Sequence, residues 1–343
     1  MSPKGKRVFK TVSAISIVLI ILLTTLIYRY YIDLKRTLIV KISSEATSLI
    51  GQKVSIGNLS FSPSAGINLY DIAIENPRDF SSGHLMKIKR LYFNINFSEL
   101  FSGRYHFKNI TVYSPELTRV TDKNGRMNIS EKLISFFKKE SKTKYRVDEF
   151  DLDSGIFDFN KDERFKNNNI DLSFKNVSSD PDTKTLISGS VLFAGDNRIK
   201  IEGWAILNNK PKRLNVSVST WDIPLSVLEV IFYGHKISAE KAKIKMGLQM
   251  EGDTENGVNF RSLFQIRNAG YSFLQKEVKD IRLSADAFFN IRDNSILIKD
   301  LSLFSGDLLS VGSTAFITNI GRNAAYSGEV KINRIDLSAF NII

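Results

Sequence analysis

The side chains best able to catalyse a reaction or bind a metal are few in this chain and widely spaced. Its 343 residues include no cysteine and only three histidines, His84, His106 and His235. A cysteine nucleophile, a thiolate zinc site and a disulfide are therefore excluded, and a histidine-based site would need distant residues to meet. The sequence contains no H-E-x-x-H, G-x-S-x-G, P-loop or glycine-rich dinucleotide motif. We expect a protein that is not an enzyme, with no catalytic residue, no metal site and no cofactor.

Charged residues are plentiful, but their pattern favours solvated surface over chemistry. The run Asp148-Glu149-Phe150-Asp151 contains three carboxylates, and such runs are typical of the polar face of a strand. The net charge is +12, and four of the basic residues lie in the first ten positions. A basic surface can be merely solvated or can attract anionic lipid headgroups, and both interpretations stay open. No basic helix or RNA-binding motif is present, so we expect no nucleic-acid partner.

The most informative pattern is apolar residues at every second position after Gly51. Such alternation is typical of antiparallel strands with one apolar and one solvated face. Eleven of these residues are our candidates for lining a groove that holds acyl chains, although such residues more often belong to an ordinary core. They are Leu91, Phe93, Ile95, Ile244, Met246, Leu248, Met250, Phe260, Phe264, Ile296 and Ile298.

A long series of such strands cannot leave its apolar face in water. It can close into a barrel, pack against a second sheet, or curve into a trough with an apolar inside. The first two arrangements give a dry core, and the third gives a groove able to hold acyl chains. Alternation alone does not separate them. We count roughly 17–20 strands with no βαβα pattern, which predicts a mainly β fold built on an elongated antiparallel sheet with a few short helical inserts.

The N-terminal segment is typical of a membrane anchor. Residues 11–28 contain no charge and are long enough to cross most of a hydrocarbon core of ~30 Å. Tyrosines and Arg29 follow, as in an aromatic belt, and the basic tail of residues 1–10 predicts a cytoplasmic N-terminus. A cleaved signal peptide is the alternative, but the apolar run ends in Tyr-Arg-Tyr-Tyr without a small-residue cleavage site. We expect a transmembrane signal anchor over residues 11–31.

The remaining chain divides by pattern into four parts. Residues 32–51 predict an amphipathic helix that ends at Gly51, with one apolar stripe formed by Leu34, Leu38, Ile42, Ala46 and Leu49. Residues 52–137 form a first β unit, and a charged linker over 138–144 separates it from a second one over 145–343. Short helices are predicted over Ser130–Lys139 and Pro224–Phe232.

Residues 51–129 resemble the N-terminal part of the AsmA family. The resemblance lies in the order and spacing of short segments directly after the anchor. They are Gly51-Gln52-Lys53-Val54, Asp71-Ile72-Ala73-Ile74 with Asn76-Pro77, Leu100-Phe101-Ser102-Gly103, Ser114-Pro115-Glu116-Leu117 and Gly125-Arg126-Met127-Asn128-Ile129. Met127 stands where the family usually has tryptophan. Beyond residue 144 the likeness is general.

The resemblance implies an inner-membrane-anchored periplasmic protein of Gram-negative bacteria. It implies a taco-like β groove of the bridge-like lipid-transfer type, and a part in phospholipid transport and outer-membrane biogenesis. The expected partners are the inner membrane, phospholipids, and an envelope protein or a second copy that pairs with the last strand at the C-terminal sheet edge. The alternative is an envelope-assembly scaffold with a dry β core that binds proteins.

Overall fold

The computed structural model describes most of the chain. The described residues are 3–62, 66–77, 80, 83–100, 102–121, 126–138, 143–159, 168–193, 197–224, 242–273, 276–306, 308–320 and 324–336. Within helices and strands, the side chains of residues 3–21, 23, 27, 97, 100, 136–138, 159, 193, 221–222, 268–273 and 276–279 are not described.

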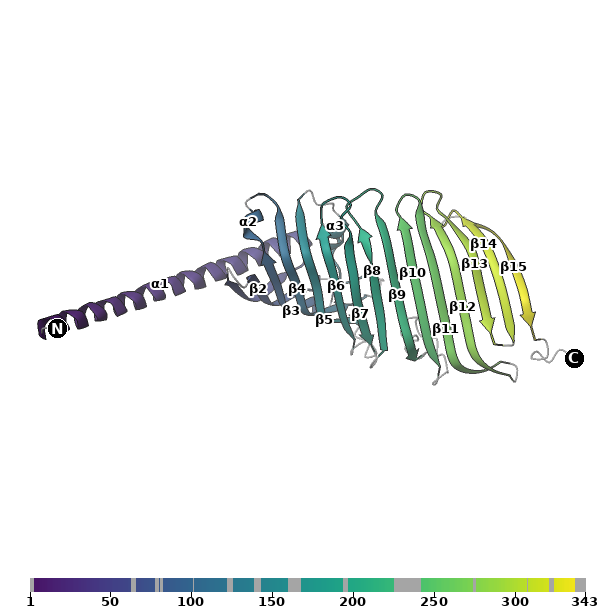
Figure 1. Ribbon diagram of the computed structural model, residues 1–343, viewed down its shortest axis with the longest axis horizontal. Coiled ribbons are helices and arrows are strands. Elements are labelled where there is room, and N and C mark those ends of the chain that lie inside the picture. The colour runs from purple at the N-terminus through teal and green to yellow at the C-terminus, as the bar shows by residue number, and fades with distance from the viewer. Residues whose placement is uncertain are drawn as a thin grey trace.

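One long helix precedes a single sheet, and two short helices interrupt its strands (Figure 1). The helices are α1 (Pro3–Ile50), α2 (Phe97–Leu100) and α3 (Glu131–Lys138). The strands are β1 (Val54–Ser62), β2 (Gly66–Glu75), β3 (His84–Ile95), β4 (Tyr105–Arg119), β5 (Tyr145–Phe159), β6 (Asn169–Ser178), β7 (Thr185–Phe193), β8 (Asn197–Ile206), β9 (Arg213–Pro224), β10 (Lys243–Asp253), β11 (Gly257–Phe273), β12 (Lys276–Asn290), β13 (Ser295–Ser305), β14 (Leu309–Thr318) and β15 (Ala325–Ile335).

The fifteen strands pair in chain order, from β1 to β15. Among the described residues, β1 pairs only with β2 and β15 only with β14, so the sheet is open and the predicted mainly β fold is confirmed. The described residues form fifteen strands, fewer than the predicted 17–20, and several of these strands are long. Strand β11 has 17 residues, and β4, β5 and β12 have 15 each.

The prediction of a wholly antiparallel sheet is wrong at one place. Strands β4 and β5 are parallel, with Tyr105 opposite Tyr145 and Arg119 opposite Phe159. A parallel pair needs a crossover that returns the chain to the end where the first strand began. Residues 120–144, which include α3, provide that crossover. Every other neighbouring pair is antiparallel.

The expected anchor and amphipathic helix are one continuous helix, α1, which ends as predicted before Gly51. The Gly51 amide bonds to the Thr47 carbonyl at 2.9 Å, and Gly51 has φ 71°, the left-handed C-cap conformation. Within the described part of the chain, we find no helix both long and apolar enough for a membrane span. Most side chains of the predicted anchor, residues 11–31, lie outside the described ones.

The first strands bend along one line without losing their apolar face. Three non-glycine residues with positive φ lie on this line in β2, β4 and β5: Asp71 (52°), Ser114 (47°) and Ser154 (56°). The strand register aligns Asp71 with Ser114 across Lys89 of the intervening β3, and it places Ser114 beside Ser154. The alternation shifts phase at the bend, so that Leu69 and Ile72, three residues apart, are both buried on the same side. Local kinks of this kind curve a sheet while keeping one face continuous.

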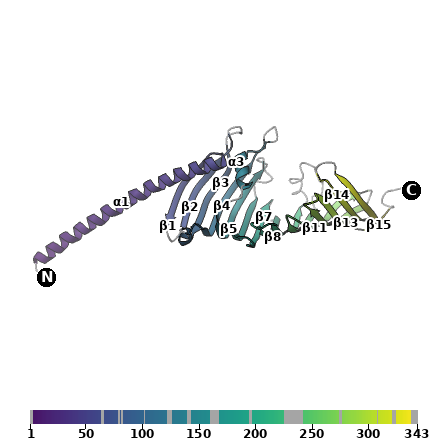
Figure 2. The ribbon, with the colours of Figure 1, turned by 90° about the horizontal axis from the view of Figure 1, so that it is seen from above.

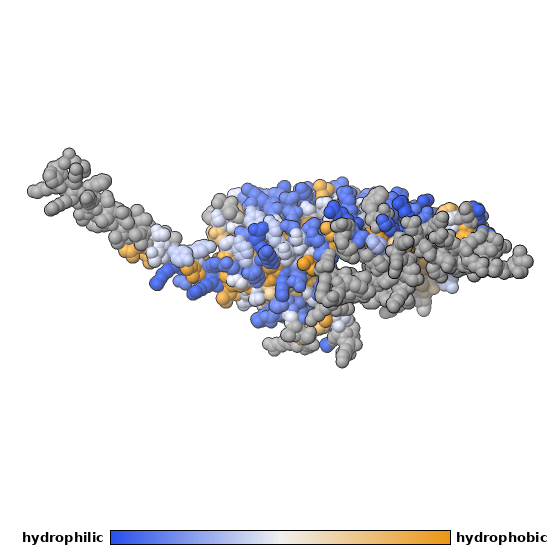
Figure 3. Space-filling view, turned by 90° about the horizontal axis from the view of Figure 1, so that it is seen from below, coloured by the Kyte–Doolittle hydropathy of each residue, from blue (hydrophilic) through white to orange (hydrophobic). Residues whose placement is uncertain are grey.

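The main core lies where α1 crosses the sheet (Figure 2). The buried side chains Val54, Ile56, Leu59, Leu69 and Ile72 of β1 and β2 pack against Leu38, Ile39, Ile42, Ala46 and Ile50 of α1. The helical stripe predicted from sequence therefore covers the sheet through its middle part, whereas Leu34 and Leu49 are exposed. Figure 3 shows hydrophobic side chains between hydrophilic ones where α1 meets the sheet. A smaller cluster joins Ala242 and Ile244 to Phe264 and Ile266.

The predicted short helices have different outcomes. Helix α3 confirms the one expected over Ser130–Lys139, and the Ser130 hydroxyl accepts the Leu133 amide at 3.1 Å as its N-cap. Of the second, Pro224 ends β9 and residues 225–232 lie outside the described ones. Residues 139–142 of the charged linker also lie outside them, so the boundary between two β units stays a prediction.

Candidate functional site

A continuous row of small and apolar residues crosses all fifteen strands. Residues directly opposite each other in neighbouring strands share a face, so the register alone defines the row. We call it the apolar row, and the face that carries it the apolar face. Its members are Phe61, Ile67, Phe93, Ile110, Phe150, Phe174, Ile187, Gly203, Val216, Met250, Phe260, Ala287, Ile298, Ala315 and Gly328.

A second row runs beside the first on the same face. It contains only two polar residues, Ser262 and Ser313, and it also reaches from β1 to β15. Its members are Leu59, Leu69, Leu91, Val112, Leu152, Leu172, Gly189, Ile201, Val218, Leu248, Ser262, Ala285, Leu301, Ser313 and Val330. Together the two rows form a strip of hydrocarbon along the whole sheet.

The opposite face is polar at the matching positions. One residue away from the apolar row, the register aligns Ser60, Asn68, Tyr92, Thr111, Asp151, Ser173, Ser188, Glu202, Ser217, Gln249, Arg261 and Asp286. We call these residues the polar row. The carboxylate run noted in the sequence follows this division, because Phe150 belongs to the apolar row and Asp151 to the polar row. The alternation in the sequence therefore becomes two chemically distinct faces.

All eleven candidate groove residues lie on the apolar face, from β3, β10, β11 and β13. Four of them, Phe93, Met250, Phe260 and Ile298, belong to the apolar row itself. Met246 lies opposite Phe264. Ten of the eleven are partly exposed. Ile244 is only 2% exposed, within the smaller core cluster, so it is a structural residue that a bound molecule cannot reach. Contact of the other ten with lipid stays a prediction.

The apolar face is covered at one end and largely uncovered elsewhere in the described residues. Helix α1 packs over β1 and β2, and the rows emerge from beneath it near Leu91 and Phe93, which are partly buried there. Farther along, buried apolar side chains are few among the described residues. They are Val147, Ala205, Ile206, Ile223, Ala242 and Ile244. The described part of the sheet thus lacks the second packed layer that a dry sandwich core requires.

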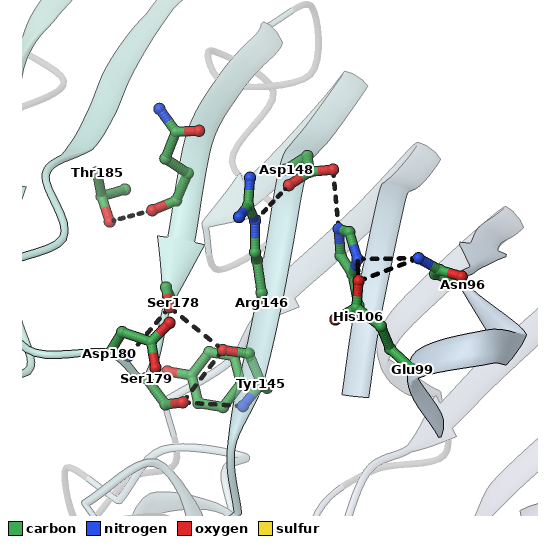
Figure 4. A network of polar contacts seen from close by, with 11 residues as sticks. Asn96, Glu99, His106, Tyr145, Arg146, Asp148, Ser178, Ser179, Asp180 and Thr185 are labelled. Atoms are coloured by element: carbon green, nitrogen blue, oxygen red, sulfur yellow. Dashed lines mark hydrogen bonds and ion pairs between the residues drawn. The ribbon is translucent and has the colours of Figure 1, made fainter. Parts of the chain in front are cut away.

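One polar cluster lies at the strand ends near α2 (Figure 4). The ring of His106, on β4, lies between two carboxylates. Its Nδ1 is 2.8 Å from Glu99 Oε1 of α2, and its Nε2 is 2.9 Å from Asp148 Oδ2 of β5. Arg146 Nε donates to the other Asp148 oxygen at 2.7 Å. The cluster ties one helix and two strands together.

The charges of this cluster shift two pKa values in opposite directions. Burial of the His106 ring lowers its pKa, but hydrogen bonds to Asp148 and Glu99 outweigh burial, and the net pKa is raised. Burial raises the pKa of Asp148, but hydrogen bonds from His106 and Arg146 outweigh it, and the net pKa is lowered. Both shifts favour the charged pair, so the arrangement acts as an ionic clamp. Sequence reasoning missed it because His106 and Asp148 are 42 positions apart in the chain.

The other candidate ligands form no such group. His84 begins β3, and His235 lies outside the described residues. In the residues that the structure describes, no cluster of three histidine, cysteine or acidic side chains is arranged to hold a metal ion. The apolar face is therefore the candidate functional surface that the described residues support.

An open sheet with one apolar and one polar face, led by a long helix, defines a mainly β protein built on one elongated sheet. The sequence model of the AsmA family matches residues 5–300, well over half of the chain, and the protein belongs to the AsmA family. The resemblance over residues 51–129 is thus confirmed, and the match continues well beyond residue 144. No curated protein and no solved structure matches the chain.

Proposed function

We propose that this protein holds phospholipid acyl chains on its apolar face and takes part in phospholipid transport and outer-membrane biogenesis. The proposal is for a non-enzymatic protein, anchored in the bacterial inner membrane by the first part of α1, with its sheet in the periplasm. Membership of the AsmA family and the large open sheet fit a lipid-transport or envelope role in general.

One observation carries the proposal, namely the unbroken apolar row from Phe61 to Gly328. An acyl chain gains ~0.8 kcal/mol for each methylene that leaves water, so its binding free energy depends on continuous apolar contact. A row without a charged member lets a chain lie anywhere along the sheet at similar energy. The polar row on the opposite face keeps that side solvated and leaves one face for lipid.

The partners follow from the same arrangement. The inner membrane holds α1, and phospholipids occupy the apolar face. Strand β15 is exposed along its whole length, with Tyr326, Val330 and Ile332 each at least 60% exposed. An envelope protein or a second copy that adds a strand there would extend the apolar row.

The test is site-specific photo-crosslinking in living cells. A benzophenone amino acid replaces Met250 or Phe260 of the apolar row in separate variants. The matched controls carry the same probe at Gln249 and Arg261, the adjacent positions of the same two strands on the polar row. After irradiation, the purified protein is analysed by mass spectrometry for covalently attached phospholipid.

We expect phospholipid adducts at Met250 and Phe260 and none at Gln249 and Arg261. Adducts at neither position of either strand would contradict lipid binding. Protein adducts at Met250 and Phe260 in place of lipid would favour the assembly scaffold. Equal lipid adducts on both faces would show contact with bulk membrane and would also contradict the groove.

A further inference from the structure

Three segments that are distant in the sequence meet where α1 ends. They are the residues around Gln52 directly after α1, Asn76 after β2, and Val120 with residues 128–130 after β4. We call Gln52, Asn76, Asn128 and Ser130 the helix–sheet joint. All four side chains bond to another of these segments, so the joint fastens the end of α1 to the sheet.

Asn128 is the centre of the joint and is fully buried, with 0% exposure. Its Oδ1 accepts the Val120 amide at 2.9 Å, and its Nδ2 donates to Asn76 Oδ1 and to the Thr118 carbonyl, both at 2.8 Å. Its own carbonyl accepts Gln52 Nε2 at 3.3 Å. Each polar atom of the side chain is used, and no other residue type supplies this combination of donors and acceptors at this size.

Gln52 and Ser130 connect the joint to helices α1 and α3. Gln52, 3% exposed, donates from Nε2 to the Glu75 carbonyl at 2.9 Å and accepts the Ser130 amide on Oε1 at 3.0 Å. The Ser130 hydroxyl donates to the Ile50 carbonyl, the last of α1. The same hydroxyl caps α3, so one side chain ends the first helix and starts the third.

Hydrogen bonds restrict direction in a way that the apolar contact beneath α1 does not. An aliphatic stripe on a sheet tolerates sliding and rotation, because dispersion and burial depend weakly on angle. Hydrogen bonds weaken steeply when they are misaligned, and breaking them here would leave buried polar atoms unsatisfied. The joint therefore adds contacts between α1 and the sheet that depend on direction.

We propose that the helix–sheet joint fixes the direction of α1 relative to the apolar face, with Gln52 and Asn128 as positioning residues. Helix α1 has 48 residues, so at 1.5 Å per residue it is about 72 Å long. A change of about 10° at the joint would move its far end by about 12 Å. The joint thus sets where the apolar face opens relative to the membrane that α1 is proposed to enter. This consequence rests on the proposed function, whereas the fixed direction does not.

The experiment measures the direction of α1 with pairs of spin labels in the purified full chain. The chain has no cysteine, so two introduced cysteines are the only labelling sites. One pair, Lys41→Cys with Ser188→Cys, reports on α1 against the sheet, since both side chains are exposed. A second pair, Ser188→Cys with Arg261→Cys, lies on the polar row and reports on the sheet alone.

Both pairs are measured in the parent chain, in the joint variant Gln52→Ala with Asn128→Ala, and in the control Asn168→Ala. Asn168 is 8% exposed and makes two hydrogen bonds to the backbone of Phe157 on β5. Phe157 lies opposite Leu117 of β4, so the control removes a similar buried amide close to the joint but outside it. In the joint variant we expect the helix–sheet distribution to broaden at least twofold while the sheet pair is unchanged. The control should leave both distributions as narrow as in the parent.

An unchanged helix–sheet distribution in the joint variant would overturn the proposal. If the distance distribution of the sheet pair also broadens, the same two measurements are made on the single variant Gln52→Ala. This variant keeps the Asn128 bonds to Thr118 and Val120, so it disturbs the sheet less. These measurements need no lipid. Their failure would leave the crosslinking at Met250 as the separate test of the proposed function.

Discussion

The two ends of the sheet share one pattern of residues and differ in what covers it. At β1 and β2, the apolar face lies under α1, and Leu59 is 3% exposed. At β15, Val330 belongs to the same row as Leu59 and is 68% exposed. The first end is also braced by the helix–sheet joint and by the clamp around His106. The same alternation in sequence therefore gives a packed end and an uncovered end, which differ in what packs over the apolar face.

The largest expected effect comes from truncating the same row at its two ends. Leu59→Ala removes a buried side chain from the cluster under α1 and should lower the free energy of unfolding by about 2–5 kcal/mol. Val330→Ala removes an exposed side chain and should change it by about 0.5 kcal/mol or less. Urea unfolding followed by circular dichroism measures both. Equal losses at the two positions would mean that β15 is as well covered as β1.

A smaller effect concerns the clamp and has a defined dependence on pH. The pKa of His106 is raised from 6.5, so the stability that it adds is fully present below pH 6.5 and is lost as pH rises through the raised value. The pKa of Asp148 is lowered from 3.8, so its contribution is present above pH 3.8 and is lost as pH falls through the lowered value. The clamp thus acts between these limits.

The variant His106→Gln should be less stable than the parent in that window, by about 1.5–3 kcal/mol, the range for hydrogen bonds to charged groups. The difference should shrink as pH rises, because the parent loses its imidazolium charge and the variant has none to lose. Thermal unfolding of both chains across the pH range checks this. A difference that stays constant with pH would show that His106 acts through packing alone.

The smallest expected effect on the free energy of unfolding concerns the line along which the first strands bend. Ser154 has φ 56°, where an L-residue is strained and glycine is not. Ser154→Gly should therefore raise the free energy of unfolding by up to about 1 kcal/mol. The control Ser173→Gly, in extended β6, should lower it by about 0.5–1 kcal/mol, because glycine costs more entropy there. Two changes of the same sign would mean that the bend stores no strain.

The periodic features of this fold were predictable from sequence. Alternation after Gly51 indicated the strands, and it placed all eleven candidate residues on one face. The single long helix was predictable too, since no proline or glycine lies between Gly5 and Gly51. The bend had a signal as well, because Leu69 and Ile72 are spaced by three where the period is two.

The features that sequence reasoning missed depend on non-local contacts. Local pattern does not say which way a strand runs, so the parallel pair β4 and β5 was not predicted. Gln52 and Asn128 are 76 positions apart and bond only because the crossover returns beneath α1. Nothing in the polar character of Gln52 distinguishes it from a surface residue, yet it is 3% exposed. The cover over one end, and the burial of Ile244, likewise follow from tertiary packing.

The apolar row has a consequence for how such a protein changes in size. Each strand contributes one member, and neighbouring strands lie ~4.8 Å apart, so fifteen strands carry the row over about 67 Å. Inserting one hairpin would lengthen it by about 10 Å and leave the chemistry of every existing position unchanged. The length of the apolar row is then set by the number of hairpins. Duplication of a two-strand unit is enough to make the row span a longer distance.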